Sequence, residues 1–268
     1  MLLKRILTAS IIAPIAIFGI LVLTQTGFAL AITLILVISS WEYCNLIQIS
    51  HLAGKLLYAS LVLVVTYILS SSPSNLTLVL YSAVVWWLIA LIWLTIFPKG
   101  SNLLKKKFAV KLINGLFIFV PMAMSLMALH LLNSVLVILL LVLIWAADVG
   151  AYFTGKFFGK NKLCPSISPG KTFEGVYGGI VLTQVVAISY VYISNQTPLL
   201  NDFLMFGLLA LAISLVSVIG DLFESALKRI AEVKDSGNIL PGHGGLLDRI
   251  DSLTSSAPIF FLLFTFLI

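Results

Sequence analysis

Charged side chains are scarce in this sequence. Of its 268 residues only 10% are Asp, Glu, Lys or Arg, whereas 60% are hydrophobic, and the mean hydropathy is +1.14. A soluble domain carries about 25% charged residues, so this chain has too few polar groups to cover a globule in water. The scarcity argues against a water-soluble protein and makes a lipid bilayer the expected solvent for most of the chain.

Residues that commonly hold metals or form disulfides are also few. Cys44 and Cys164 form no C-x-x-C pattern, so neither a disulfide framework nor a thiolate metal site is predicted. The three histidines, His51, His130 and His243, lie far apart in the sequence, which makes a zinc or haem site a poor fit. Carboxylates remain as the candidate metal ligands.

Long hydrophobic segments, by contrast, run through the whole chain. A bilayer core requires about 20 apolar residues of helix, and turn or polar residues such as Pro73, Pro98 and Asn133 separate the segments. We therefore predict an all-α integral membrane protein with about nine transmembrane helices, at residues 6–23, 27–48, 56–70, 76–97, 112–132, 135–157, 174–194, 203–227 and 253–268. The third and the last segments are short for a full span.

The distribution of Lys and Arg agrees with nine spans. When the loops are numbered alternately, all 16 Lys and Arg residues fall on the side of the N-terminus, and the opposite loops contain only one charged residue, Asp202. Cytoplasmic loops collect Lys and Arg, so we predict a cytoplasmic N-terminus and an outside C-terminus in a cell (inner) membrane. This topology explains the net charge of +6 without a nucleic-acid partner.

Acidic residues gather in the second half of the chain. Eight of the ten lie in two stretches, 148–179 and 221–252, and only Glu42 and Asp202 lie outside them. We therefore divide the chain into N-terminal membrane helices, residues 1–111 with spans one to four, and a catalytic membrane region, residues 112–268 with spans five to nine. Two predicted cytoplasmic loops, 156–173 and 228–252, belong to the catalytic region.

Two carboxylates are predicted to lie inside spans. Asp148 precedes Lys156 by eight residues and Asp221 precedes Lys228 by seven, which places them about 12 Å and about 10 Å from the cytoplasmic ends of their helices. An ionisable residue inside the membrane is costly, and its default interpretation is functional. The alternative is that each carboxylate simply pairs with a lysine from a neighbouring helix.

The second stretch combines a polar helix face with a glycine-dense segment. The face, which must meet protein or water rather than lipid, consists of Asp221, Glu224, Ser225 and Lys228 at helical spacing. Residues 241–245 permit a close backbone approach to a ligand, although an ordinary turn would also explain their glycines. Asp248 and Asp251 share a helical face if the last helix has begun there.

Carboxylates that alternate with Lys and Arg suit a metal-bound polyphosphate. Mg²⁺ is typically held by one or two carboxylates plus substrate phosphates, and basic side chains neutralise the remaining phosphate charge. Gly170-Lys171-Thr172 resembles the end of a phosphate-binding loop, but that pattern requires a glycine where Pro165 stands, and no strand is expected before it. Lys171 remains a phosphate-binding candidate with a different geometry.

A dense pattern of charged and small residues runs from Ser225 to Asp251. It includes Ser225, Lys228-Arg229, Lys234-Asp235, Pro241-Gly242-His243-Gly244-Gly245 and Asp248-Arg249-Ile250-Asp251. This pattern resembles the C-terminal signature of the phosphatidate cytidylyltransferase family, which is met at every specified position over these 27 residues. The segments around Asp148 and at residues 168–175 are similar to the family too, so the resemblance covers the C-terminal half by motif and the N-terminal half by topology.

The resemblance implies a function and a set of ligands. The function is transfer of a cytidylyl group from CTP to phosphatidic acid, a membrane lipid, by a homodimer at the cytoplasmic leaflet. The cofactor is a divalent cation, usually Mg²⁺, with K⁺ as a further candidate at the same site. The resemblance suggests Asp221 and Asp248 as metal ligands, with Asp251 close by.

We assign roles on this basis. The predicted catalytic residues are Asp221, Asp248, Asp251, Lys228 and Arg229, of which the three aspartates hold the metal. The predicted substrate-binding residues are Lys171, Lys234, Asp235, His243, Arg249, Ser225 and Asp148. The basic side chains would stabilise pyrophosphate or hold the lipid phosphate. Asp148 would complete the metal site or orient a lysine, and His243 either contacts the nucleotide or is a turn residue.

Two other functions remain open from the residues alone. A related enzyme could use CTP to phosphorylate a lipid alcohol, as polyprenol kinases do, and would release CDP instead of pyrophosphate. A transporter could use intramembrane carboxylates as ion ligands, but such proteins often show two related repeats, and no convincing repeat is present here.

Overall fold

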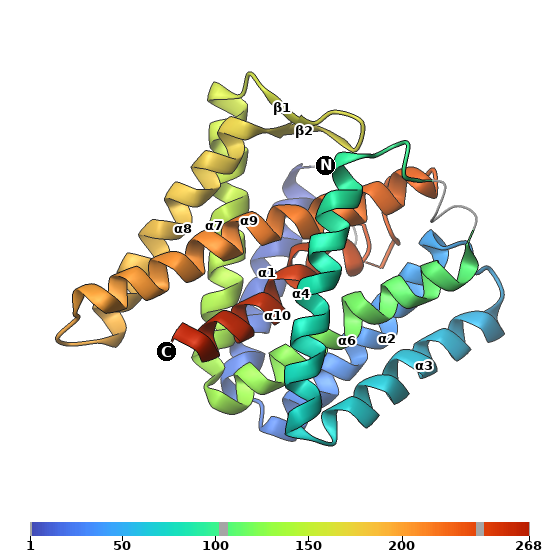
Figure 1. The fold of residues 1–268 in the computed structure, drawn as a ribbon, viewed down its shortest axis with the longest axis horizontal. Helices are drawn as coiled ribbons and strands as arrows, with labels where there is room; N and C mark the ends of the chain where they lie inside the picture. Colours follow the sequence, from blue (N-terminus) through green and yellow to red (C-terminus); the bar gives the residue numbers. More distant parts are fainter. Residues whose placement is uncertain (1, 102–106, 240–243, 268) are drawn as a thin grey trace.

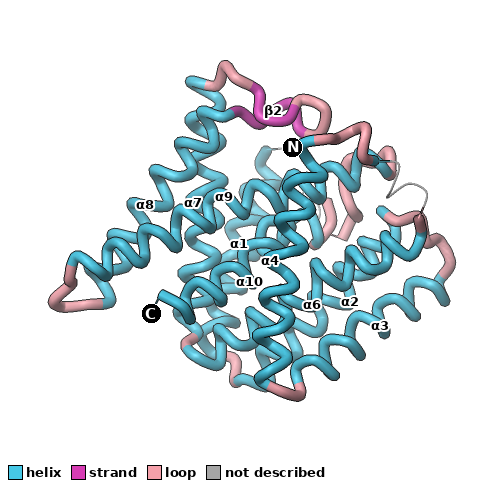
Figure 2. The backbone as a smooth tube through the Cα atoms, in the orientation of Figure 1, coloured by secondary structure: helices cyan, strands magenta, loops and turns pink. Residues whose placement is uncertain are grey.

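The computed structural model of the chain describes residues 2–101, 107–239 and 244–267. Within them the chain is helical apart from one small hairpin (Figures 1 and 2). The first half contributes α1 (Leu2–Val22), α2 (Gln25–Leu46), α3 (Leu52–Ser70) and α4 (Pro73–Thr95). The second half contributes α6 (Phe108–Leu132), α7 (Ser134–Phe158), α8 (Phe173–Ser194), α9 (Leu200–Ile230) and α10 (Leu247–Leu267).

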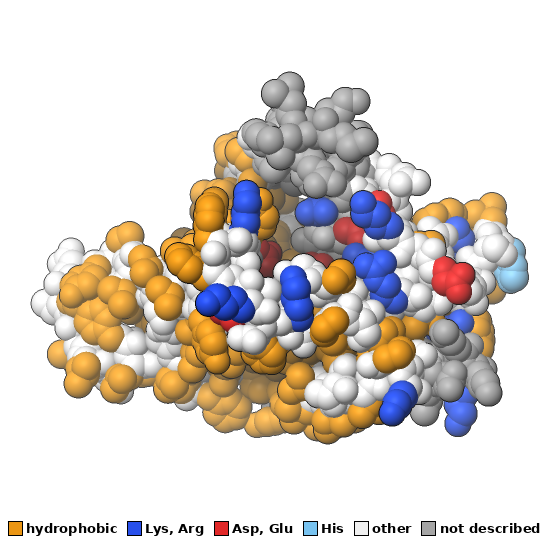
Figure 3. Space-filling view, turned by 90° about the horizontal axis from the view of Figure 1, so that it is seen from above, with side chains coloured by type: hydrophobic (Ala, Val, Ile, Leu, Met, Phe, Trp, Pro, Cys, Tyr) orange, Lys and Arg blue, Asp and Glu red, His pale blue; other side chains and the backbone are white. Residues whose placement is uncertain are grey.

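The helices coincide with the predicted spans. Eight of those in the described residues are long and apolar enough to cross a membrane, and α1 adds a shorter apolar segment, Ala13–Val22. Figure 3 shows hydrophobic side chains over the flanks of the molecule and charged side chains gathered on the face that it views. The prediction of an all-α, multi-pass membrane protein is thereby confirmed.

Most helices begin a few residues earlier than predicted, and the two shortest predicted spans show why. Helix α3 begins at Leu52 instead of residue 56, and α10 begins at Leu247 instead of residue 253. In both helices the first turn or two contain charged residues, which lower the local hydropathy although the backbone is helical. The early start of α10 matters for the site, because it places Asp248 and Asp251 within the helix.

Local caps account for several helix starts. Thr24 Oγ1 accepts a hydrogen bond from Gly27 N at 3.2 Å before α2, and Thr172 Oγ1 accepts one from Gly175 N at 3.1 Å before α8. Such side chains satisfy N–H groups that the first turn of a helix leaves without an intrahelical partner. Helix α4 begins instead with Pro73, at a position where no backbone N–H is required.

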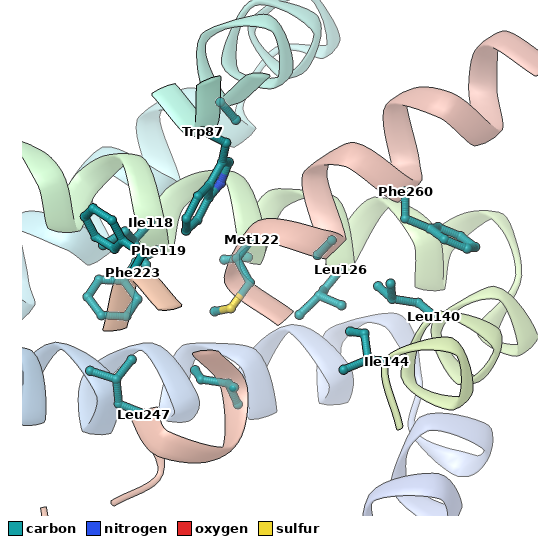
Figure 4. Packing of buried hydrophobic residues seen from close by; sticks show 14 of the residues in the cluster. Trp87, Ile118, Phe119, Met122, Leu126, Leu140, Ile144, Phe223, Leu247 and Phe260 are labelled. Carbon is teal, nitrogen blue, oxygen red and sulfur yellow. The ribbon is translucent and has the colours of Figure 1, made fainter. Parts of the chain in front are cut away.

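Helix α6 lies at the centre of the bundle. In its most apolar stretch of 18 residues, 67% of the residues are buried inside the protein, whereas the corresponding share is 22% in α3 and in α8. The outward side chains of α3 and α8 would therefore face lipid. Figure 4 shows Phe119 of α6 beside Phe223 of α9, and Phe223 in turn meets Trp87 of α4 edge to face with ring centroids 5.7 Å apart. This core joins the N-terminal helices to those that carry the charged stretches.

Helices α7 and α8 pack closely because glycines lie at their interface. A Cβ at Gly150 would lie 2.8 Å from the carbonyl carbon of Gly178, and a Cβ at Gly179 would lie 2.9 Å from the carbonyl oxygen of Ala147. Larger residues at these positions would push the helices apart. The pair therefore fixes the connection between α7 and α8 above one end of the bundle (Figure 1).

That connection is an antiparallel hairpin of β1 (Lys162–Cys164) and β2 (Ser168–Thr172). The expectation that no strand precedes Lys171 is therefore wrong, since Lys171 itself lies in β2 and β1 comes before it. The strands have three and five residues and include Lys, Pro and Gly, so they lack the β-branched, alternating pattern by which strands are recognised. Pro165 still excludes the phosphate-binding loop.

Candidate active site

Helix α9 carries the predicted polar face. Ser225 Oγ donates to Asp221 Oδ1 at 3.2 Å, and Lys228 Nζ lies 3.2 Å from Glu224 Oε1. Each pair is four residues apart, so the side chains lie above one another on one side of the helix. Only 6% of the Glu224 side chain is exposed. The face therefore meets protein at Glu224 instead of lipid.

The β1–β2 hairpin brings a lysine from the first stretch to this face. Lys171 Nζ lies 2.6 Å from Asp221 Oδ2, and both side chains are about one quarter exposed. Arg229 of α9 fixes the hairpin, because its Nε donates to the carbonyl oxygen of Ile167 at 3.1 Å and Ile167 is fully buried. Asp221 is thus paired with a lysine, as expected if the intramembrane carboxylates are structural ion-pair partners. The contact of Arg229 with the hairpin was not predicted from the sequence.

Asp248, in the first turn of α10, is surrounded by donors. Lys228 Nζ lies 2.6 Å from its Oδ1. Its Oδ2 accepts from Ser236 N at 2.9 Å, from Ser236 Oγ at 3.0 Å and from Gly245 N at 2.8 Å. Asp248 therefore ties α9 to the segment that precedes α10, and Lys228 joins the carboxylates of both helices.

Two further predicted carboxylates, Asp148 and Asp251, belong to the same cluster. Asp251 interacts electrostatically with Asp221, Lys171 and Lys228. Asp148 of α7 interacts with Asp221, Lys171 and Arg249. The structure thus brings charged groups of the two predicted stretches together. Figure 3 shows acidic and basic side chains around a hollow on one face, with acidic side chains at its depth.

A small pocket lies beside the cluster, lined by Glu224 and Asp251 together with Tyr43, Leu247 and other side chains. Oε1 of Glu224 is ion-paired with the Lys228 ammonium group at 3.2 Å, which leaves Glu224 Oε2 with acceptor capacity in the described part of the chain. The sequence placed Glu224 on the polar face but assigned it no role. A buried carboxylate with free acceptor capacity is a further candidate for binding a cation.

The donor set fits Mg²⁺ at two of the predicted ligands. In the described part of the chain no three His, Cys, Asp or Glu side chains form a ready metal-binding group. Mg²⁺, however, needs only one or two protein carboxylates when substrate phosphates supply the other ligands. Asp221 and Asp251 are close enough to repel each other electrostatically, and a cation between them would offset that repulsion. Both oxygens of Asp248 already accept hydrogen bonds, so its metal role stays a prediction.

Other predicted contacts lie at the margin of the cluster. Lys234 and Asp235 are exposed in the turn after α9, where Asp235 packs against Gly244. Gly244 has a φ of +81°, which favours glycine because it is in the left-handed region. Arg249 is exposed in the first turn of α10. His243 lies outside the described residues, so its predicted contact with the nucleotide is untested.

The chain is similar to several known proteins. A phosphatidate cytidylyltransferase of Pseudomonas aeruginosa is 39% identical over 263 residues, which cover 97% of this chain and 96% of the relative. One of Haemophilus influenzae is 34% identical over 97% of both chains, and one of Bacillus subtilis is 52% identical over 126 residues, 47% of this chain and 46% of the relative. The model of the cytidylyltransferase family matches residues 3–267. This chain therefore belongs to the cytidylyltransferase family.

Proposed function

We propose that the chain is a CTP:phosphatidate cytidylyltransferase, which converts phosphatidic acid and CTP to CDP-diacylglycerol and pyrophosphate in phospholipid synthesis. The observation that carries the proposal is the cluster in which Lys171 and Lys228 contact Asp221 and Asp248 at the ends of apolar helices. The names of two relatives that match over nearly the whole chain support the choice of substrates.

In the proposed reaction an oxygen of the phosphatidic acid phosphate attacks the α-phosphorus of CTP. A new P–O bond forms while the bond from the α-phosphorus to the bridging oxygen breaks, and that oxygen leaves with pyrophosphate. The attacking phosphate is already anionic at neutral pH, so no strong general base is required. Catalysis then depends on positioning the two phosphates and neutralising their charge.

Lys171 and Lys228 are the proposed phosphate ligands. Each ammonium group lies 2.6 Å from a carboxylate oxygen, of Asp221 and Asp248 respectively, so its position is fixed before substrate binds. The Lys171 side chain is 24% exposed and that of Lys228 is 14% exposed, which makes Lys171 the more accessible of the two. Ser225, Arg229, Lys234, Asp235 and Arg249 remain predicted substrate contacts.

We propose Mg²⁺ as the cofactor, held by Asp221 and Asp251, with Asp248 as the third predicted ligand. Bound Mg²⁺ would supply charge neutralisation at the triphosphate. K⁺ is a further candidate cation. Until a metal binds, Lys171 is the partner of Asp221, and Asp148 lies within electrostatic range of both groups. Asp148 is thereby suited to orient Lys171, as the sequence analysis suggested.

The proposed location is a cell (inner) membrane, with the active site on the cytoplasmic side and the enzyme acting as a homodimer. In the predicted topology all 16 Lys and Arg residues fall on the side of the membrane that includes the site, which supports this orientation. Labelling of cysteines introduced at Lys99 and at Thr197 from either side of sealed vesicles tests it. Crosslinking in the membrane tests the dimer.

The deciding experiment uses purified protein in detergent with labelled CTP, phosphatidic acid and Mg²⁺. We expect a CDP-lipid and pyrophosphate in equal amounts. We expect Asp221→Asn to lower turnover about 100-fold or more. Asp202→Asn, which alters a carboxylate in the first turn of α9, at the opposite end of that helix, should retain it. Release of CDP with a phosphorylated lipid alcohol would indicate a kinase instead. Absence of CTP turnover without sealed vesicles would remove the proposal and favour a transporter.

A further inference from the structure

Glu42 is a buried carboxylate that the proposed reaction does not use. It lies on α2, one turn before the helix ends at Leu46, and only 1% of the residue is exposed. A buried carboxylate is costly unless hydrogen-bond donors surround it. The donors of Glu42 come from a part of the chain about 200 residues away, next to the proposed catalytic residues.

The chain between Ile230, where α9 ends, and Leu247, where α10 begins, is called the α9–α10 turn below. Two described parts of it, residues 236–237 and 244–247, contact Glu42. Leu247 N donates to Glu42 Oε2 at 2.7 Å, and Ser236 Oγ lies 3.4 Å from the same oxygen. Gly237 and Gly245 pack so tightly that a Cβ on either would lie 2.8 Å or 2.6 Å from Glu42 Cδ. The backbone of these two glycines therefore approaches a carboxylate of α2.

The same residues hold Asp248. Ser236 N, Ser236 Oγ and Gly245 N all donate to Asp248 Oδ2, so Ser236 lies between the two carboxylates. Leu247 N belongs to the first turn of α10, where N–H groups lack intrahelical partners and negative charge is favourable. Glu42 thus fixes both the start of α10 and the hydroxyl that contacts Asp248.

We infer that Glu42 is a positioning residue, which holds residues 236–237 and 244–247 against α2 so that Asp248 and Lys228 keep their geometry for the transfer reaction. The effect on turnover rests on the proposed function, whereas the effect on the α9–α10 turn does not. The N-terminal helices, in which Glu42 lies, would then support the active site directly in addition to anchoring it in the membrane.

The variant Glu42→Gln keeps the size of the side chain and removes its charge. Its matched control is Asp202→Asn, because Asp202 Oδ2 likewise accepts from a backbone N–H at a helix start, Leu199 N at 2.9 Å before α9. We expect Glu42→Gln to lower kcat about 10- to 100-fold with little change in KM for CTP, because the lysine that is more open to substrate, Lys171, is untouched. Asp202→Asn should retain wild-type kcat.

Amide hydrogen exchange of the same proteins gives a measurement that does not depend on turnover. We expect exchange at Gly245 and Leu247 to become about 10-fold faster or more in Glu42→Gln and to stay unchanged in Asp202→Asn. If the wild type turns over no CTP, the proposed function fails while the exchange still reports the contact. Unchanged exchange in Glu42→Gln, or faster exchange with wild-type kcat, overturns the inference.

A second variant keeps the test valid if Glu42→Gln does not fold. In Gly237→Ala the three atoms nearest to the added methyl group would all belong to Glu42, so the Glu42 side chain must shift from the position in which it accepts from Leu247 N. We expect the same fall in kcat of about 10-fold or more. In Gly170→Ala, by contrast, the methyl group meets no atom within 4 Å. Equal kcat in the two glycine variants would contradict the role of Glu42.

Discussion

Lys228 is the cation shared by two carboxylates, and its removal should cost more stability than removal of either partner. Its Nζ lies 2.6 Å from Asp248 and 3.2 Å from Glu224, and the three side chains are 14%, 5% and 6% exposed. In Lys228→Met both carboxylates lose their cation, and breaking a buried pair in this way costs about 3–5 kcal/mol. In Asp248→Asn, Lys228 keeps Glu224 and the amide oxygen can still accept from Ser236 and Gly245. The loss is then one charge-assisted hydrogen bond, about 1.5–3 kcal/mol.

Thermal unfolding in detergent, measured beside CTP turnover, separates the two variants. Each kcal/mol lowers Tm by about 2–4 °C in a chain of this size, so Lys228→Met should have the lower Tm. Because the residues are in contact, the double variant should lose less stability than the sum of the single variants. Both single variants should lose turnover, Asp248→Asn while it remains folded in the membrane. A lower Tm for Asp248→Asn, or strictly additive losses, would refute this account of Lys228, and full turnover in Asp248→Asn would remove Asp248 from the metal role.

Three further predictions follow from the site and its supports. Removal of divalent cations with EDTA should abolish turnover, and added Mg²⁺ should restore it, as measured by pyrophosphate release. Gly150→Ala should destabilise the protein by about 1–3 kcal/mol in thermal unfolding, because the methyl group would collide with the backbone of α8, whereas Gly19→Ala, whose Cβ meets only Leu23 at 3.8 Å, should not. Arg229→Ala should release the hairpin from α9 and so speed protease cleavage near Ile167 and raise KM for CTP, since Lys171 is held by the same hairpin.

The sequence was sufficient to identify the membrane helices but not to place the residues at which they begin and end. Hydrophobic length alone identifies a span, because lipid cannot satisfy backbone polar groups and only a helix satisfies them internally in such a segment. At α10 the same criterion fails, since Asp248, Arg249 and Asp251 lower the hydropathy of a turn that is helical all the same. The close packing of this part of α10 against Gly220 of α9 and the hydrogen bonds of Asp248 compensate for that polarity, and neither can be read from one segment of sequence.

The candidate site could be located from the sequence but not assembled. Acidic and basic residues in two stretches indicated where the chemistry lies, yet the pairing of Lys171 with Asp221 depends on a hairpin without a strand signal. Glu42 is a residue that the sequence analysis did not assign to the site. It is a carboxylate inside a predicted span, like Asp148 and Asp221, and the same criterion would have marked it. Its position outside the two stretches concealed a contact across about 200 residues of sequence.

The balance of charge in the cluster explains why a cation is expected there. With every group ionised, the five acidic residues Asp148, Asp221, Glu224, Asp248 and Asp251 and the three basic residues Lys171, Lys228 and Arg249 leave two formal negative charges. By itself such a site would repel both a triphosphate and a lipid phosphate, and the repulsion is strong where side chains are shielded from water. One divalent cation offsets that excess and leaves the lysines free to exchange carboxylate partners for phosphate oxygens. Binding of CTP itself, and not only its turnover, should therefore require Mg²⁺, and tight binding of CTP in EDTA would contradict this reasoning.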